Sequence, residues 1–181
     1  MSSRRKNDRS AVTIVIVMGV SGSGKTTIAR GVAQREGWLL LEGDQFHPPA
    51  NVAKMKAGTP LTDEDRWPWL GAIAAREDEL RAAGQSAVVA CSALRRAYRD
   101  ILIGGRSDAV LVYLRGSKAL IAERMQRRKN HFMPPALLDS QFDTLEEPTP
   151  DEDPIIIDIG VESGAVTEET IRRLRVRLVN G

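Results

Sequence analysis

The chain has 181 residues, enough for one domain with its own hydrophobic core. Hydrophobic residues make up 42% of it, which excludes a chain that is disordered throughout. The net charge is only +2 and aromatic residues are 4%, so the composition argues against a nucleic-acid-binding surface. The lone Cys91 cannot form a disulfide within the chain, and no segment approaches the ~18 apolar residues of a membrane span. We therefore expect a cytoplasmic protein without membrane contact.

The N-terminal region is polar and basic, and we expect residues 1–11 to form a disordered tail. The tail and the apolar stretch 11–20 together imitate a signal peptide. The apolar stretch ends in a glycine-rich loop, however, and not in a small-residue cleavage site. We predict that residues 12–181 form a single domain.

Residues 12–18 are apolar and rich in β-branched side chains, a pattern typical of a buried parallel strand. A glycine-rich segment follows, and after it Ile28 and Val32 stand four residues apart, as on one face of a helix. Strand, loop and helix form the context in which the motif G-x-x-x-x-G-K-[ST] binds phosphates. The segment fits that motif at every defined position: Gly19, Val20, Ser21, Gly22, Ser23, Gly24, Lys25 and Thr26.

The physical basis of this motif is the loop backbone. Glycines allow successive N–H groups to turn toward an anion, and the N-terminal end of the following helix adds positive potential. Lys25 is expected to reach the β- and γ-phosphates, and the Thr26 hydroxyl to bind Mg²⁺. We include Thr27, the next residue of the helix, in the nucleotide site. The sequence thus predicts ATP and Mg²⁺ as cofactors.

The rest of the chain alternates apolar strands with helical patterns. Further strands are predicted at 38–41, 86–91, 109–114 and 154–159, and helices at 25–36, 51–57, 63–83, 92–100, 117–129, 136–145 and 167–179. Such alternation predicts an α/β fold, a P-loop three-layer α/β/α sandwich with a five-stranded parallel sheet. We expect residues about 45–70 to form a substrate cap and residues about 124–146 to form a lid.

Two common classes of P-loop protein lack their signatures here. A switch GTPase would carry N-K-x-D after a later strand, where this chain has Arg115-Gly116-Ser117. A motor ATPase would have an apolar strand that ends in Asp-Glu, but the third strand ends in Cys91-Ser92. These differences favour a compact small-molecule kinase.

Several longer blocks accompany the P-loop. They are Gly43-Asp44-x-x-His47-Pro48-x-x-Asn51-x-x-Lys54-Met55, Gly58-x-Pro60-Leu61-x-Asp63-x-Asp65-Arg66-x-Pro68-Trp69-Leu70, Cys91-Ser92-Ala93-Leu94-x-x-x-Tyr98-Arg99-Asp100, Arg124-x-x-x-Arg128-x-x-His131-Phe132 and Gln141-Phe142-x-x-Leu145-Glu146. With these blocks the chain, over about residues 12–160, resembles the gluconate kinases (gluconokinases), P-loop kinases related to shikimate and nucleoside monophosphate kinases. One departure is Glu42, where relatives often carry Asp.

The resemblance implies a nucleoside-monophosphate-kinase-like fold and a homodimer. It also implies ATP-dependent phosphorylation of D-gluconate on its terminal hydroxyl. Alternatives are a shikimate-kinase-like enzyme and an ATP-binding regulator without turnover. A shikimate kinase would show a glycine triplet after the third strand, where Ser92-Ala93-Leu94 stands.

Asp44 follows a strand end beside the P-loop, so it is the candidate to orient or deprotonate the attacking hydroxyl. A loop-capping role is the alternative. Glu42 and Asp44 are also expected to hold Mg²⁺ through water. A sugar acid brings a carboxylate, which favours arginines. Arg66 and Arg99 are the first candidates and Arg95 the next.

His47 and the arginines at 124 and 128 each have a functional and a structural interpretation. His47 either hydrogen-bonds substrate hydroxyls or braces the turn at Pro48-Pro49. Arg124 and Arg128 are one turn apart on a predicted helix, and a closing lid would bring them over the phosphates. A solvated basic helix face is the other interpretation. His131 and Phe132 are expected to pack at the hinge of the lid.

Overall fold

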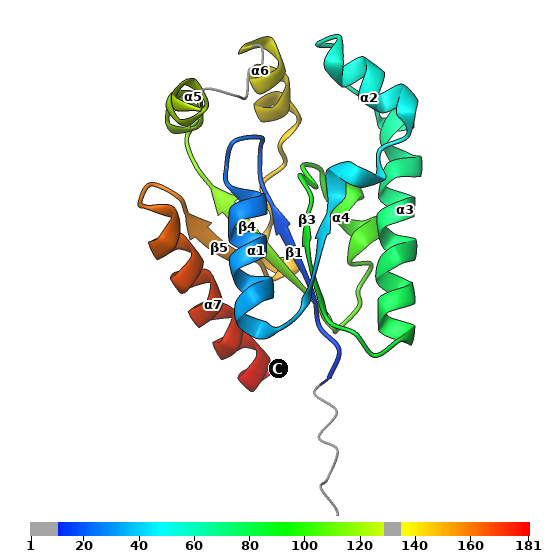
Figure 1. Ribbon diagram of the computed structural model, residues 1–181, viewed down its shortest axis with the longest axis vertical. Coiled ribbons are helices and arrows are strands. Elements are labelled where there is room, and N and C mark those ends of the chain that lie inside the picture. Colours follow the sequence, from blue (N-terminus) through cyan, green and yellow to red (C-terminus); the bar gives the residue numbers. More distant parts are fainter. Residues whose placement is uncertain (1–10, 129–134) are drawn as a thin grey trace, which may run out of the picture.

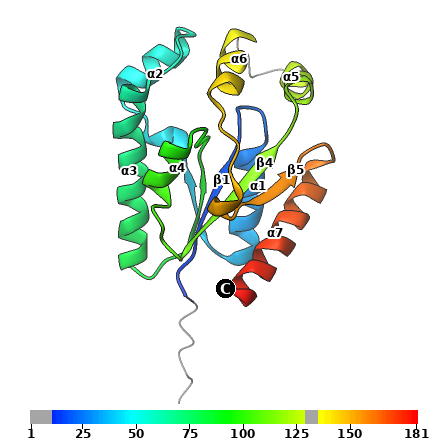
Figure 2. The same ribbon diagram turned by 180° about the vertical axis from the view of Figure 1, so that it is seen from behind.

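The computed structural model describes residues 11–128 and 135–181, and it shows a parallel sheet with helices on both faces (Figures 1 and 2). The order of the five strands is β2-β3-β1-β4-β5, and every described pair is parallel. The predicted α/β sandwich is therefore confirmed. The predicted tail lies, apart from Ala11, outside the described residues. The strands are β1 (Ile14–Met18), β2 (Leu39–Glu42), β3 (Ala87–Ala90), β4 (Ala109–Arg115) and β5 (Ile155–Asp158).

Strand β1 lies at the centre of the sheet, and all of its side chains are buried. Ile16 lies opposite Val89 of β3 and Leu111 of β4. Successive side chains of a strand point to opposite faces, so Ile16 and Val17 pack in the two separate hydrophobic layers of the domain. Burial on both faces explains why this strand is a continuous apolar run rather than an alternating one.

Seven α-helices surround the described sheet: α1 (Lys25–Glu36), α2 (Pro49–Lys56), α3 (Asp63–Ala82), α4 (Arg96–Leu102), α5 (Lys118–Arg127), α6 (Pro135–Thr144) and α7 (Ser163–Asn180). Helices α1 and α7 cover one face of the sheet, and α3 and α4 cover the other. Helices α2, α5 and α6 stand beyond the carboxyl ends of the strands (Figure 1). Within the described residues no helix combines the length and the apolar composition that crossing a membrane requires.

Several helix boundaries differ from the predictions, and two of these differences affect predicted site residues. The helix predicted at 92–100 begins only at Arg96, because Ala93 has a left-handed backbone (φ 44°) and Arg95 is extended. The helix predicted to continue to residue 129 ends at Arg127, and Arg128 has already left the helical conformation (ψ 102°). Arg124 and Arg128 therefore do not share one helical strip, as the sequence spacing had suggested.

Helix α3 begins with a capping box. The Thr62 hydroxyl accepts from the Asp65 backbone N–H (3.3 Å), and the Asp65 carboxylate accepts from the Thr62 N–H (2.9 Å). Lys54 of α2 donates to both oxygens of the same carboxylate, at 2.8 and 2.7 Å. The Lys54 hydrogen bond lowers the pKa of Asp65 to about 2. This pair joins α2 to the start of α3.

A buried carboxylate lies in the second half of α3. Glu77 is completely buried, and its nearest cation is Arg81, whose Nη1 lies 3.6 Å from Oε2. Neither carboxylate oxygen has a hydrogen-bond partner among the described residues. Burial raises the pKa of Glu77 to about 7, with a small upward contribution from Asp78, while the charges of Arg81 and Arg106 oppose the shift. Arg81 also forms an ion pair with Asp108, at 2.9 Å.

This carboxyl makes the stability of the protein depend on pH. The pKa of Glu77 is about 7 in the folded protein, against 4.5 for a glutamate in water, so the folded state binds the proton more tightly. Its stabilising contribution is complete below about pH 4.5 and is lost as the pH rises through about 7. We expect Glu77→Gln to flatten the fall in unfolding free energy over this range, as measured by urea denaturation. Glu64→Gln, on an exposed part of the same helix, should retain the wild-type slope, and an unchanged slope in Glu77→Gln would contradict the assignment.

Candidate active site

The glycine-rich loop connects the end of β1 to the start of α1. Gly22 and Gly24 have left-handed backbones (φ 82° and 95°), which non-glycine residues rarely adopt. Gly24 is the N-cap of α1 and supplies no side-chain cap to its first turn. The backbone N–H groups at this end of the helix are consequently directed to a ligand position at the carboxyl edge of the sheet.

Lys25 lies at the base of this loop. Its Nζ donates to the carbonyl oxygen of Val20 across the loop at 3.0 Å. Burial lowers the pKa of Lys25, and the carboxylates of Asp44 and Glu42 oppose that shift. The ammonium is thus held inside the loop, close to two acids that come from the end of β2.

Thr26 and Glu42 meet at the mouth of the loop. The Thr26 hydroxyl donates to the Glu42 carboxylate at 2.9 Å. No group of three or more His, Cys, Asp or Glu side chains that could enclose a metal ion occurs in the described part of the chain. One hydroxyl and one carboxylate fit Mg²⁺, which usually takes its other ligands from phosphate groups and water.

Asp44 and His47 follow Glu42 in the short helix η1 (Gly43–Phe46) and just beyond it. Asp44 is exposed, and its charge raises the pKa of both Lys25 and His47, opposing the effect of their burial. The His47 ring stacks on Trp69, with centroids 4.2 Å apart, and its Nδ1 lies 3.3 Å from the Asn51 amide nitrogen. Burial, aided by the charge of Arg66, lowers the pKa of His47. The His47 ring is therefore held in place by Trp69 and Asn51, and the charge of Asp44 acts on it.

Arg66 and Arg95 are brought together by Asp63 and Tyr98. Arg66 Nη1 donates to the Tyr98 hydroxyl at 3.1 Å, and its guanidinium lies over the Tyr98 ring. Arg95 Nη1 donates to Asp63 Oδ2 at 3.0 Å. The Tyr98 hydroxyl donates to the other oxygen of Asp63. Burial and this hydrogen bond raise the pKa of Tyr98 to about 12, so the phenol stays protonated.

The structure gives Arg99 a different location from the predicted one. Its side chain is buried, and Nε and Nη2 donate to the Glu152 carboxylate at 2.5 and 2.9 Å. Its Nη1 donates to the carbonyl oxygens of Ala93, Leu94 and Glu146. Because the guanidinium is surrounded by protein acceptors, Arg99 anchors the loop before α4 instead of facing a substrate.

The two arginines predicted to belong to a lid, Arg124 and Arg128, have different surroundings. Arg124 donates through Nη2 to the carbonyl oxygens of Ile159 and Val161, in the loop between β5 and α7. Arg128 is exposed, and its positive charge makes a small contribution to the lowered pKa of Lys25. The predicted hinge residues His131 and Phe132 lie outside the described residues.

A contact that sequence reasoning missed joins α6 to the P-loop. Gln141 Oε1 accepts from the Ser21 backbone N–H at 2.6 Å, and Gln141 Nε2 donates to the Ser21 hydroxyl at 2.8 Å. Gln141, Asp63 and Tyr98 all stand in the sequence blocks quoted above. Their presence in those blocks suggested that these residues matter, but the spacing within the blocks does not indicate which residues they contact.

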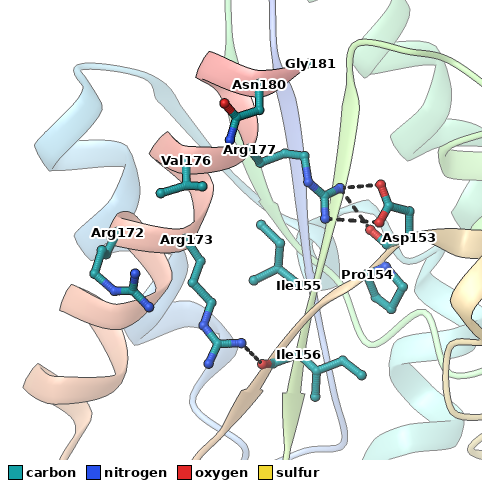
Figure 3. A pocket seen from close by; sticks show the side chains of 10 residues that line it. All are labelled: Asp153, Pro154, Ile155, Ile156, Arg172, Arg173, Val176, Arg177, Asn180 and Gly181. Atoms are coloured by element: carbon teal, nitrogen blue, oxygen red, sulfur yellow. Dashed lines mark hydrogen bonds and ion pairs between the residues drawn. The ribbon is translucent and has the colours of Figure 1, made fainter.

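A pocket of about 520 Å³ lies elsewhere on the molecule, between the start of β5 and the C-terminal part of α7 (Figure 3). Arg177 pairs there with Asp153 at 2.8 Å, and Arg173 donates to the Ile156 carbonyl at 3.0 Å. The pocket lies at the amino end of β5, whereas the P-loop follows the carboxyl end of β1. It is therefore not part of the candidate active site.

A P-loop after the central strand of a parallel sheet, with acids and arginines from the neighbouring loops, defines the class of P-loop small-molecule kinases. A family model described as an AAA domain matches residues 14–148. The gluconokinase of Gluconobacter oxydans is 48% identical over 161 residues, which cover 89% of this chain and 90% of that protein. This chain belongs to the gluconokinase family.

Two solved structures have the same fold over nearly their whole length. A gluconokinase from Sinorhizobium meliloti is 42% identical with a TM-score of 0.85, covering 95% of this chain and 96% of that chain. An unliganded sugar kinase from Janibacter is 46% identical with a TM-score of 0.86, covering 93% of this chain and 97% of that chain.

The different environments of the arginines lead to a mutational prediction. Arg99→Ala would leave the Glu152 carboxylate buried without its cation, so we expect the free energy of unfolding to fall by about 3–5 kcal/mol in urea denaturation. Arg96→Ala, whose ion pair with Asp151 is exposed, should lower it by no more than about 1 kcal/mol. Unchanged stability in Arg99→Ala, together with a raised KM for the phosphoryl acceptor, would return Arg99 to the substrate site.

Proposed function

We propose that this protein transfers the γ-phosphoryl group of ATP to the terminal hydroxyl of D-gluconate, giving 6-phosphogluconate and ADP. The observation that carries the proposal is that an intact P-loop and the Arg66–Arg95 pair come from the connections that follow three neighbouring strands. The P-loop follows β1, Arg66 lies in α3 on the connection after β2, and Arg95 lies in the loop after β3. The high identity to gluconokinases supports gluconate as the acceptor. We further propose a cytoplasmic homodimer.

The nucleotide would lie along the P-loop, from Gly19 to Thr27. Backbone N–H groups of the loop and the Lys25 ammonium bind the phosphates, and their positive charge stabilises the negative charge of the transition state. The Thr26 hydroxyl, with Glu42 and Asp44 acting through water, would hold Mg²⁺. When bound, this ion neutralises charge on the β- and γ-phosphates.

The acceptor would lie between η1 and the arginine pair. Arg66 and Arg95 each retain guanidinium N–H groups that do not bind Asp63 or Tyr98, and these groups bind the gluconate carboxylate. His47 hydrogen-bonds a substrate hydroxyl from its position over Trp69.

Asp44 orients the terminal hydroxyl and accepts its proton while the hydroxyl oxygen bonds to the γ-phosphorus. The bond between that phosphorus and the β–γ bridging oxygen breaks, and the bridging oxygen leaves with ADP. Little covalent assistance is needed, because phosphoryl transfer depends mainly on positioning and charge neutralisation.

The lid would add positive charge near the transferred phosphoryl group. The charge of Arg128 makes a small contribution to the lowered pKa of Lys25, and on lid closure Arg128 would stabilise charge on the transferred group. Arg124 binds two carbonyl oxygens of the loop after β5, so it would have to exchange these partners on lid closure in order to reach a phosphate. A role for Arg124 in the nucleotide site therefore depends on movement of α5.

The proposed reaction is tested by release of ADP from Mg·ATP in the presence of gluconate, shikimate, glucose, AMP or water alone. We expect release that requires gluconate, with 6-phosphogluconate as the second product. Release that requires shikimate would identify a shikimate-kinase-like enzyme. ATP binding without release for any acceptor would identify a regulator, and either outcome would overturn the proposal.

The residue roles are tested by substitution. Arg66→Ala and Arg95→Ala should each raise the gluconate KM about 10- to 100-fold, because each removes a charge-assisted hydrogen bond. Asp44→Asn should lower kcat about 10²- to 10⁴-fold with a smaller change in KM. Arg76→Ala, on an exposed part of α3, is the matched control and should retain wild-type kinetics. An unchanged gluconate KM in either arginine variant would remove that residue from the carboxylate site.

A further inference from the structure

Helices α5 and α6 both contact the outer rim of the P-loop, at Ser21 and Gly22. A Cβ atom added to Gly22 would lie 2.9 Å from Met125 Cγ and 3.3 Å from Ile121 Cγ2, so α5 packs directly against the loop backbone. On the adjacent residue, Gln141 of α6 makes its two hydrogen bonds to Ser21. The two helices of the predicted lid thus lie directly against the phosphate-binding loop.

The two hydrogen bonds between Gln141 and Ser21 require a side chain that has the length and the amide group of glutamine. Its carbonyl oxygen accepts from a backbone N–H and its NH₂ group donates to a hydroxyl of the same residue, so both ends of the amide are used. Helix α6 also places Leu138 in the hydrophobic layer that contains α1. Because α6 is held by Leu138 independently, Gln141 is available to orient the loop rather than to anchor the helix.

The segment that follows α6 leads to the arginine site. The Glu146 N–H donates to the Leu94 carbonyl at 2.8 Å, and the Glu146 carboxylate accepts from the Arg96 N–H at 2.8 Å. Arg99 donates to the Glu146 carbonyl at 3.0 Å. These bonds fix the C-terminal side of α6 to the loop and helix that carry Arg95 and Tyr98. Gln141 is therefore at one end of a short segment whose other end is fixed at the acceptor site.

We propose that Gln141 is a positioning residue for ATP: through its paired hydrogen bonds to Ser21 it holds the P-loop in the conformation that binds the phosphates. This inference deepens the proposed function and rests on it, since it requires that the P-loop bind ATP. Gln141 acts through the loop and is assigned no contact with the reacting atoms. Its effect is on nucleotide affinity, with gluconate affinity and the chemical step changed less.

The test measures binding of Mg·ATP by titration calorimetry and steady-state kinetics on the full chain. Gln141→Leu should weaken ATP binding and raise the ATP KM about tenfold, with kcat changed by less than about threefold, because two hydrogen bonds that orient the loop are lost. The Asn side chain is one methylene shorter than Gln and cannot span both contacts, so Gln141→Asn should also weaken ATP binding and raise the ATP KM. This variant provides a second test if Gln141→Leu does not fold. Asp143→Asn, on an exposed part of the same helix, is the matched control and should bind ATP as the wild type does.

A double-mutant cycle with Ser21→Ala separates positioning from a structural role. Ser21→Ala removes the hydroxyl that accepts from Gln141. Gln141→Leu should therefore weaken ATP binding by only about twofold when Ser21→Ala is already present, compared with about tenfold in the wild type. A lowered melting temperature with unchanged ATP affinity would overturn the proposal, and so would strictly additive effects or tighter ATP binding in Gln141→Leu. The proposed function is tested separately by turnover of the wild-type protein with gluconate. Failure of the Gln141 proposal can therefore be distinguished from failure of the proposed function.

Discussion

The active site depends on the burial of β1 on both faces, because that burial holds the P-loop at one place on the edge of the sheet. Strands β3 and β4 pair with β1 on either side. The loop is also tightly confined where it leaves the strand. A Cβ added to Gly19 would lie 2.6 Å from Ser23 Oγ and 3.0 Å from the Leu114 carbonyl. Glycine is therefore required there for close packing as well as for backbone conformation.

The arginines of this protein show how the same side chain acquires different functions from its surroundings. Arg99 binds Glu152 and three carbonyl groups inside the protein and stabilises the loop before α4. Arg66 and Arg95 share Asp63 and Tyr98 but keep donors for a ligand. If Arg66 and Arg95 bind the acceptor as proposed, the Asp63 carboxylate between them would orient both side chains before substrate arrives and so reduce the conformational entropy lost on binding.

Local patterns predicted much of the fold. The apolar runs predicted all five strands, and the glycine motif in its strand–loop–helix context predicted the phosphate loop. Predictions were weaker wherever a partner distant in sequence decides the outcome. Arg99 stands next to Tyr98 in one motif, yet its partner Glu152 is 53 residues away. The predicted helix through Arg128 ends earlier, and Gln141 contacts Ser21 across 120 residues.

The class of chemistry can be inferred from the amino-acid sequence alone, because phosphate binding requires backbone N–H groups, a lysine and a hydroxyl within a few consecutive residues. The sequence also determined the layers of the fold, since burial on both faces of a strand requires a continuous apolar run. Which arginines are enclosed by protein acceptors and which keep donors for a ligand became evident only from the three-dimensional fold. That choice depends on which carboxylates and carbonyl groups the fold brings within hydrogen-bond distance, and the order of residues along the chain does not specify those distances.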